Sequence, residues 1–125
     1  MYRIWCKNNN NWKTNVFVSP TGDMVEIKNN MMLPLSPKNH ILQLKSKFKD
    51  SNGKYIFEGD LINASTLSMP IEVWYDDGGS WVAGIKEGED SCDDYLWRTL
   101  HQFPGCKVVG NIFEGVIEND MWNMY

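Results

Sequence analysis

Apolar and polar residues alternate along much of this chain, as they do in β-strands that are buried on one face. The first such stretch is Tyr2–Lys7, in which Tyr2, Ile4 and Cys6 share a face, and the asparagines at positions 8–11 follow it as a loop. The same pattern, bounded by turn residues, predicts further strands. These are expected at residues 12–18, 24–28, 40–48, 55–57, 60–64, 71–75, 81–86 and 106–113.

Residues 93–103 carry the helical pattern, because Leu96, Leu100 and Phe103 follow at i, i+4 and i+7 behind acidic residues. Many short strands without a βαβ rhythm predict a mainly β fold, and we expect a small β-barrel with one short helix. The expected domains are an N-terminal β-meander section at 1–30, a linker or crossing loop at 31–39 that contains two prolines, and a β-barrel domain at 40–125.

The segment DSNGKYIFEGDLI, residues 50–62, places two turn signals around a three-residue apolar run. Asparagine and glycine adopt positive φ at least cost, so the first signal predicts a tight hairpin turn. A glycine between two acids at a strand start predicts a sharp bend, as small barrels need. The segment is therefore interpreted as a structural corner built by Asn52, Gly53, Glu58, Gly59 and Asp60.

The length and net charge of the chain narrow the classes of protein to which it can belong. A chain of 125 residues favours one domain, or one domain with a small appendage, and a net charge of −4 argues against a general nucleic-acid binder. The 3 cysteines lack C-x-x-C spacing and cannot all pair, which predicts reduced thiols. No apolar run reaches the roughly 20 residues of a membrane helix, so we expect no membrane partner.

The candidate acidic interaction patch consists of Asp76, Asp77, Glu87, Glu89, Asp90, Asp93 and Asp94. Carboxylates at this density can bind a divalent cation or act as acid and base. EF-hand spacing is absent, so the acids are interpreted as a solvated loop that caps the following helix. An acidic face that imitates nucleic-acid phosphates in a host protein's groove is a third interpretation. No catalytic residue, metal or cofactor is predicted.

The candidate basic binding patch consists of Lys45, Lys47, Lys49, Lys54, Phe48 and Tyr55. Basic and aromatic side chains together can bind single-stranded nucleic acid or a nucleotide. Lysines on the outer face of an edge strand also discourage aggregation between sheets, and this interpretation is preferred. Candidate oligomer or partner contacts are the apolar and aromatic residues Met31, Met32, Leu33, Trp122 and Tyr125.

Three motifs carry a family resemblance: SKFKDSNGKYIFEGDLI from Ser46, KVVGNIFEG from Lys107, and YRIWCKNNNNW from Tyr2. In this order they resemble the motifs of the YopX-like phage and prophage proteins. Lys47 stands where that family usually has glycine, and Cys6 where it has an acid. The resemblance implies an SH3-like β-barrel with an added N-terminal β-section and self-association.

We therefore expect a non-catalytic phage accessory protein that forms a homo-oligomer in the host bacterial cytoplasm. It is expected to bind a host protein or sequester a small signal, and so to interfere with host defence. The alternative is a nucleic-acid-associated regulator that uses the lysine-rich strand 45–54. A metal-dependent hydrolase using the acids near Asp76 and Asp94, and a structural protein of the virion, are less favoured.

Overall fold

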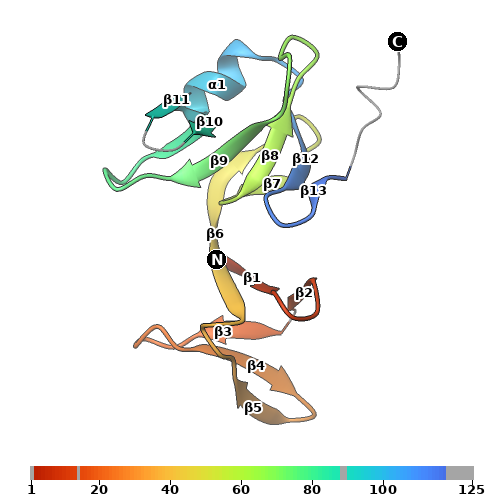
Figure 1. Ribbon diagram of the computed structural model, residues 1–125, viewed down its shortest axis with the longest axis vertical. Coiled ribbons are helices and arrows are strands. Elements are labelled where there is room, and N and C mark those ends of the chain that lie inside the picture. The colour runs from red at the N-terminus through yellow and green to blue at the C-terminus, as the bar shows by residue number, and fades with distance from the viewer. Residues whose placement is uncertain (1, 14, 88–89, 118–125) are drawn as a thin grey trace. The chain divides into compact units, whose positions relative to one another are not determined.

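The fold is mainly β with one short helix, as the sequence predicts. The computed structural model describes residues 2–13, 15–87 and 90–117, apart from the side chains of residues 87 and 90–92 (Figure 1). The chain divides into two compact units, Met1–Leu44 and Lys45–Tyr125. The division lies inside one strand, whereas the sequence placed a boundary at residues 31–39.

The first unit contains two antiparallel sheets. Strand β1 (Tyr2–Cys6) pairs with β2 (Asn11–Lys13) and with the first half of β6 (His40–Lys49). Strands β3 (Val16–Val18), β4 (Met24–Lys28) and β5 (Met31–Pro34) form a three-stranded sheet in that order.

The Tyr2 hydroxyl joins the two sheets of the first unit. It accepts a hydrogen bond from the Val18 N–H at 2.7 Å and donates one to the Val16 carbonyl at 3.2 Å. The two hydrogen bonds of this half-buried phenol connect β3 to β1.

Two predictions about the first unit are wrong. The expected strand 12–18 is two strands, because Asn15 has a φ of 53° and interrupts the extended backbone. The expected linker 31–39 begins with a strand, β5. Asn29 and Asn30 adopt φ of 54° and 61°, which suits a two-residue hairpin turn between β4 and β5.

The second unit is built on a six-stranded antiparallel sheet in the order β11-β10-β9-β8-β12-β13. Its strands are β8 (Asp60–Asn63), β9 (Ile71–Tyr75), β10 (Trp81–Glu87), β11 (Asp90–Tyr95), β12 (Lys107–Asn111) and β13 (Gly115–Val116). The second half of β6 pairs with β7 (Tyr55–Phe57). The core is formed by Ile56, Ile62, Ala64, Val73, Ala83, Leu96, Cys106 and Val108.

Helix α1 (Leu96–Gln102) contacts β10 and β11 and buries Leu96 and Thr99 (Figure 1). The predicted helix 93–103 is too long at its start, because Asp90–Tyr95 pairs along β10 as strand β11. The helix also lacks the acidic cap that was expected. Its N-cap is Tyr95, with no side-chain hydrogen bond to the first turn.

Candidate functional site

The Asp50 carboxylate organises the first family motif. Its Oδ1 accepts hydrogen bonds from the N–H groups of Asn52 at 2.9 Å and Lys54 at 2.8 Å. Its Oδ2 accepts one from the N–H of Val108, 58 residues further along, at 2.9 Å. The carboxylate is buried, and it therefore joins the tight turn to strand β12 of the second family motif.

Other residues of the two motifs also form hydrogen bonds that build turns and connect segments. The Asp60 carboxylate accepts the Phe57 N–H at 2.8 Å, and the Gly59 carbonyl accepts the Ile112 N–H at 2.9 Å. Asn111 Oδ1 accepts the N–H groups of Phe113 and Glu114, each at 3.0 Å. Of the predicted Asn-Gly pair, Gly53 has a positive φ and Asn52 does not, and Gly59 also has a positive φ. The hydrogen bonds of these motif residues thus stabilise the fold.

Cys106 lies buried next to this corner. Burial and, to a smaller extent, the negative charge of Asp50 raise the pKa of its thiol from 9.0 to about 11. A thiol with so high a pKa stays protonated at neutral pH and is a poor nucleophile.

The raised pKa predicts how stability depends on pH. The unfolded chain releases this proton near pH 9.0 and the folded chain near pH 11, so the stabilisation is present below pH 9 and is lost as pH rises through this interval. We expect the wild type to lose about 2 kcal/mol more unfolding free energy than Cys106→Ala between pH 8 and 11. Urea denaturation at the two pH values measures this difference, and equal losses would contradict it.

The lysine strip, Lys45, Lys47, Lys49 and Lys54 beside Tyr55, lies on β6, β7 and the turn between them. Lys45 Nζ lies 3.7 Å and Lys49 Nζ 4.8 Å from the centroid of the Tyr55 ring. The ammonium groups of both lysines therefore make cation–π contacts with the Tyr55 ring. Phe48 was predicted to belong with them, but it packs against the core cluster.

The described residues of the predicted acidic patch lie in the β9–β10 turn and on β11. Asp76 Oδ1 accepts the Ser80 N–H at 2.9 Å and closes the β9–β10 turn, and Asp77 beside it is exposed. Asp93 and Asp94 lie on β11. Glu89 and the side chains of Glu87 and Asp90 lie outside the described residues. In the described part of the chain, no group of three or more His, Cys, Asp or Glu side chains could hold a metal ion.

The structure describes three of the five residues predicted to contact a partner. Met31 and Met32 are exposed on β5 and Leu33 is half-buried, while Trp122 and Tyr125 lie outside the described residues. None of the helices within the described ranges is long and apolar enough to cross a membrane.

A surface that the sequence did not predict lies where β11 meets α1. The α1 aromatic cluster consists of Tyr95, Trp97 and Arg98. The two rings stack with centroids 6.2 Å apart and planes 12° apart. The guanidinium carbon of Arg98 lies 5.5 Å from the Tyr95 centroid and 5.2 Å from that of Trp97. Trp97 is 54% and Tyr95 43% exposed.

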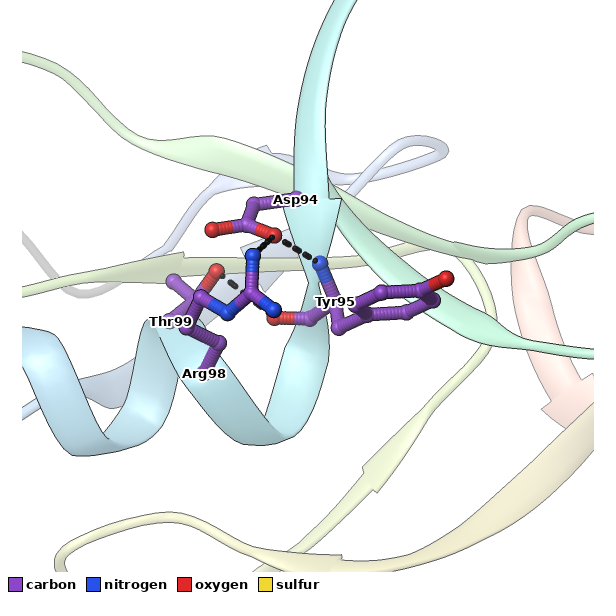
Figure 2. Close-up of polar contacts among 4 residues, drawn as sticks. All are labelled: Asp94, Tyr95, Arg98 and Thr99. Atoms are coloured by element: carbon purple, nitrogen blue, oxygen red, sulfur yellow. Dashed lines mark hydrogen bonds and ion pairs between the residues drawn. The ribbon is translucent and has the colours of Figure 1, made fainter.

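Asp94 and Thr99 hold this cluster in place (Figure 2). Asp94 Oδ1 lies 3.1 Å from Arg98 Nη1 and accepts the Tyr95 N–H at 2.8 Å. The buried Thr99 hydroxyl donates to the Tyr95 carbonyl at 3.1 Å. Both the N–H and the carbonyl of Tyr95 are thus hydrogen-bonded, and Asp94 orients the guanidinium of Arg98.

A small cleft adjoins the cluster. Its volume is about 250 Å³, and its apolar lining includes Leu67, Ile71 and Phe103. Asp94 and Thr99 also line it. The same two residues form hydrogen bonds with Tyr95 and Arg98 of the α1 aromatic cluster.

One sequence signal could have found this surface. Trp97 and Arg98 lie off the stripe formed by Leu96, Leu100 and Phe103, so the helical pattern places both side chains on the exposed face of the helix. The stacking with Tyr95 could not be predicted, since it depends on where strand β11 ends.

Comparison with known proteins gives two similarities. The YopX protein family matches residues 1–116. Among solved structures, the X-ray crystal structure of protein yopX from Bacillus subtilis is similar, with a TM-score of 0.57 and 16% identity over 90% of this chain and 91% of that one. No curated protein matches. At this identity, the structural likeness shows a shared fold alone.

Proposed function

This chain belongs to the YopX family, and we propose that it is a non-catalytic, self-associating phage protein that binds a host protein in the bacterial cytoplasm. Interference with host defence is the purpose that we assign to it. The proposal retains the SH3-like barrel that the family resemblance implies for the second unit. The single observation that carries it is the exposed, pre-oriented α1 aromatic cluster.

The composition of the cluster supports a protein partner. Tryptophan, tyrosine and arginine are the residues most enriched among those that dominate protein–protein binding energy. The side chains of Tyr95 and Trp97 lose little entropy on binding because they are already stacked. The cleft beside them has room for one apolar side chain of a partner.

The burial and hydrogen bonding of two carboxylates and one thiol support a non-catalytic role. The buried carboxylates of Asp50 and Asp60 accept backbone hydrogen bonds, and the buried thiol of Cys106 is kept protonated. A catalytic acid, base or nucleophile needs access to substrate and a pKa near the working pH.

Removal of the exposed ring tests the proposal. We expect Trp97→Ala to weaken capture of a host protein at least about thirtyfold, since a central aromatic contact contributes about 2 kcal/mol or more. The measurement is an affinity pull-down of tagged full-length protein from bacterial host lysate, read by native mass spectrometry and followed by titration with the purified partner.

Two tyrosines give a matched control for that experiment. Tyr75 is 42% exposed and Tyr95 43%, but Tyr75 packs edge-on against Trp81 and lies outside the cluster. Tyr95→Ala should weaken capture and Tyr75→Ala should leave it unchanged. Equal effects of the two, or full capture by Trp97→Ala, would contradict the proposal.

The lysine strip supports the alternative of nucleic-acid binding. That function predicts binding of a single-stranded DNA oligonucleotide that weakens steeply with salt and is abolished by Lys45→Glu with Lys47→Glu. The contacts of Lys45 and Lys49 with Tyr55 argue against it, because both ammonium groups already contact the ring on which a base would stack. We expect no salt-dependent binding by fluorescence anisotropy.

A further inference from the structure

The cleft beside the α1 aromatic cluster is lined by apolar and by acidic side chains. Leu67, Ile71 and Phe103 provide apolar surface within a volume of about 250 Å³. Among the described residues, the charged ones in its lining are Asp93 and Asp94, and both are acidic. An apolar side chain that enters the cleft is stabilised by leaving water, and a cationic group beside it is attracted by the carboxylates. The lining therefore favours a ligand that is both apolar and basic.

The Asp94 carboxylate has one oxygen left for a cation. Both of its contacts within the cluster use Oδ1, which accepts the Tyr95 N–H and pairs with Arg98. No described residue donates a hydrogen bond to Oδ2, which points away from the Tyr95 N–H (Figure 2). The Asp94 side chain is 38% exposed, and an ionised carboxylate can accept about four hydrogen bonds. A second cation can therefore bind Asp94 while Arg98 keeps its place.

The unit that carries the cleft is strongly acidic. Residues 45–125 contain 14 acidic and 7 basic residues, a net charge of −7, whereas residues 1–44 contain 2 acidic and 5 basic residues, a net charge of +3. A negative field attracts basic partners to the second unit and repels acidic ones. The charge of the whole unit thus agrees with that of the cleft.

Arg98 restricts where a cation of the partner can bind. Its guanidinium lies over the rings of both Tyr95 and Trp97, so a second cation on the same ring faces would meet a like charge. The Asp94 carboxylate lines the cleft itself and is the better acceptor. The apolar and the cationic group of the ligand therefore have to lie next to each other.

We propose that the host protein occupies this cleft with a basic segment, in which one apolar side chain enters the cleft and a neighbouring arginine or lysine pairs with Asp94. Charge complementarity selects this partner, because the lining and the unit around it are both acidic. The inference rests on the host-protein binding in the proposed function and names the chemistry of the bound segment. A nucleic acid or an acidic segment has the wrong charge for this site.

Capped peptides and the full chain test the inference by nuclear magnetic resonance titration. Three peptides are compared, with the central sequences Arg-Leu-Arg, Glu-Leu-Glu and Arg-Gly-Arg between terminal glycines. We expect the Arg-Leu-Arg peptide to shift the backbone amide signals of Leu67, Ile71 and Thr99, which line the cleft. It should bind at least about tenfold more tightly than Arg-Gly-Arg, which has no side chain to fill the cleft. The same margin is expected over Glu-Leu-Glu, which the acidic residues repel.

Two acidic residues give a matched control for the charge. Asp94→Asn and Asp77→Asn remove the same charge from the same unit, but Asp77 lies in the β9–β10 turn and does not line the cleft. Asp94→Asn should weaken binding of the Arg-Leu-Arg peptide about threefold or more. Asp77→Asn should change it by less than about 1.5-fold, because salt screens a distant exposed charge.

Three results would overturn the inference: equal binding of Arg-Leu-Arg and Glu-Leu-Glu, equal effects of the two aspartate variants, or no signal shift with any peptide at about 5 mM. If Trp97→Ala still abolishes capture of a host protein, any of these results leaves host binding standing and removes the basic segment. The expected order of the peptides without capture of a host protein supports the chemistry of the cleft while it contradicts host binding.

Discussion

Asp50→Ala is expected to reduce the free energy of unfolding by about 3 kcal/mol or more. The change removes the acceptor of three backbone N–H groups, and one of them, that of Val108, is buried. A buried N–H without an acceptor pays its full cost of desolvation, and a cavity replaces the carboxylate. Urea denaturation followed by intrinsic tryptophan fluorescence measures the loss.

Two variants control this experiment. Asp77→Ala removes an exposed carboxylate from the β9–β10 turn and should change stability by less than about 0.5 kcal/mol. Asp50→Asn keeps one oxygen acceptor and should fall between the two. If Asp50→Ala were as stable as Asp77→Ala, the carboxylate would not join the two family motifs in the way described.

Gly110→Ala is expected to cost about 3 kcal/mol and to displace β13 from β12. A Cβ at this position would collide with the Gly115 carbonyl oxygen and would lie 2.9 Å from the Val116 Cα. These are backbone atoms of the paired strand, so no side chain can move aside. Thermal denaturation and amide hydrogen exchange of β12 and β13 check the prediction.

Gly78→Ala provides the comparison. Its Cβ would approach the Asp76 side chain at 3.3 Å, without a backbone collision, and its effect should stay below about 1 kcal/mol. Protected amides on β13 in the Gly110→Ala variant would show that β12 and β13 stay paired, contrary to expectation.

Both predictions concern residues of the family motifs, and this limits what family membership can say about function. Asp50, Gly110 and Asn111 are required by the turn, the β12–β13 approach and the loop after β12. A relative can keep them and differ in function, because function depends on the surface that the fold presents. The α1 aromatic cluster lies between the two motifs and belongs to neither.

The alternating pattern by itself determined the class of the fold and most strands. It placed β4, β7 and β9 at their observed bounds, because turn residues flank each of these short apolar or alternating stretches. It could not find β5, because consecutive Met31 and Met32 are exposed on opposite faces. Nor could it find β11, since the acidic sequence DSCDDY offers no apolar alternation.

The candidate surfaces depended on tertiary structure for a different reason. Lysines and aromatics near each other in sequence suggested a basic patch, but pairing across β6 and β7 decided that Lys45 and Lys49 cover Tyr55. The sequence contains Trp97 and Arg98, yet only the junction of β11 with α1 stacks them on Tyr95. Periodicity reports which side chains are buried, whereas a binding surface is made by exposed side chains, and their neighbours are set by strand register and chain reversals.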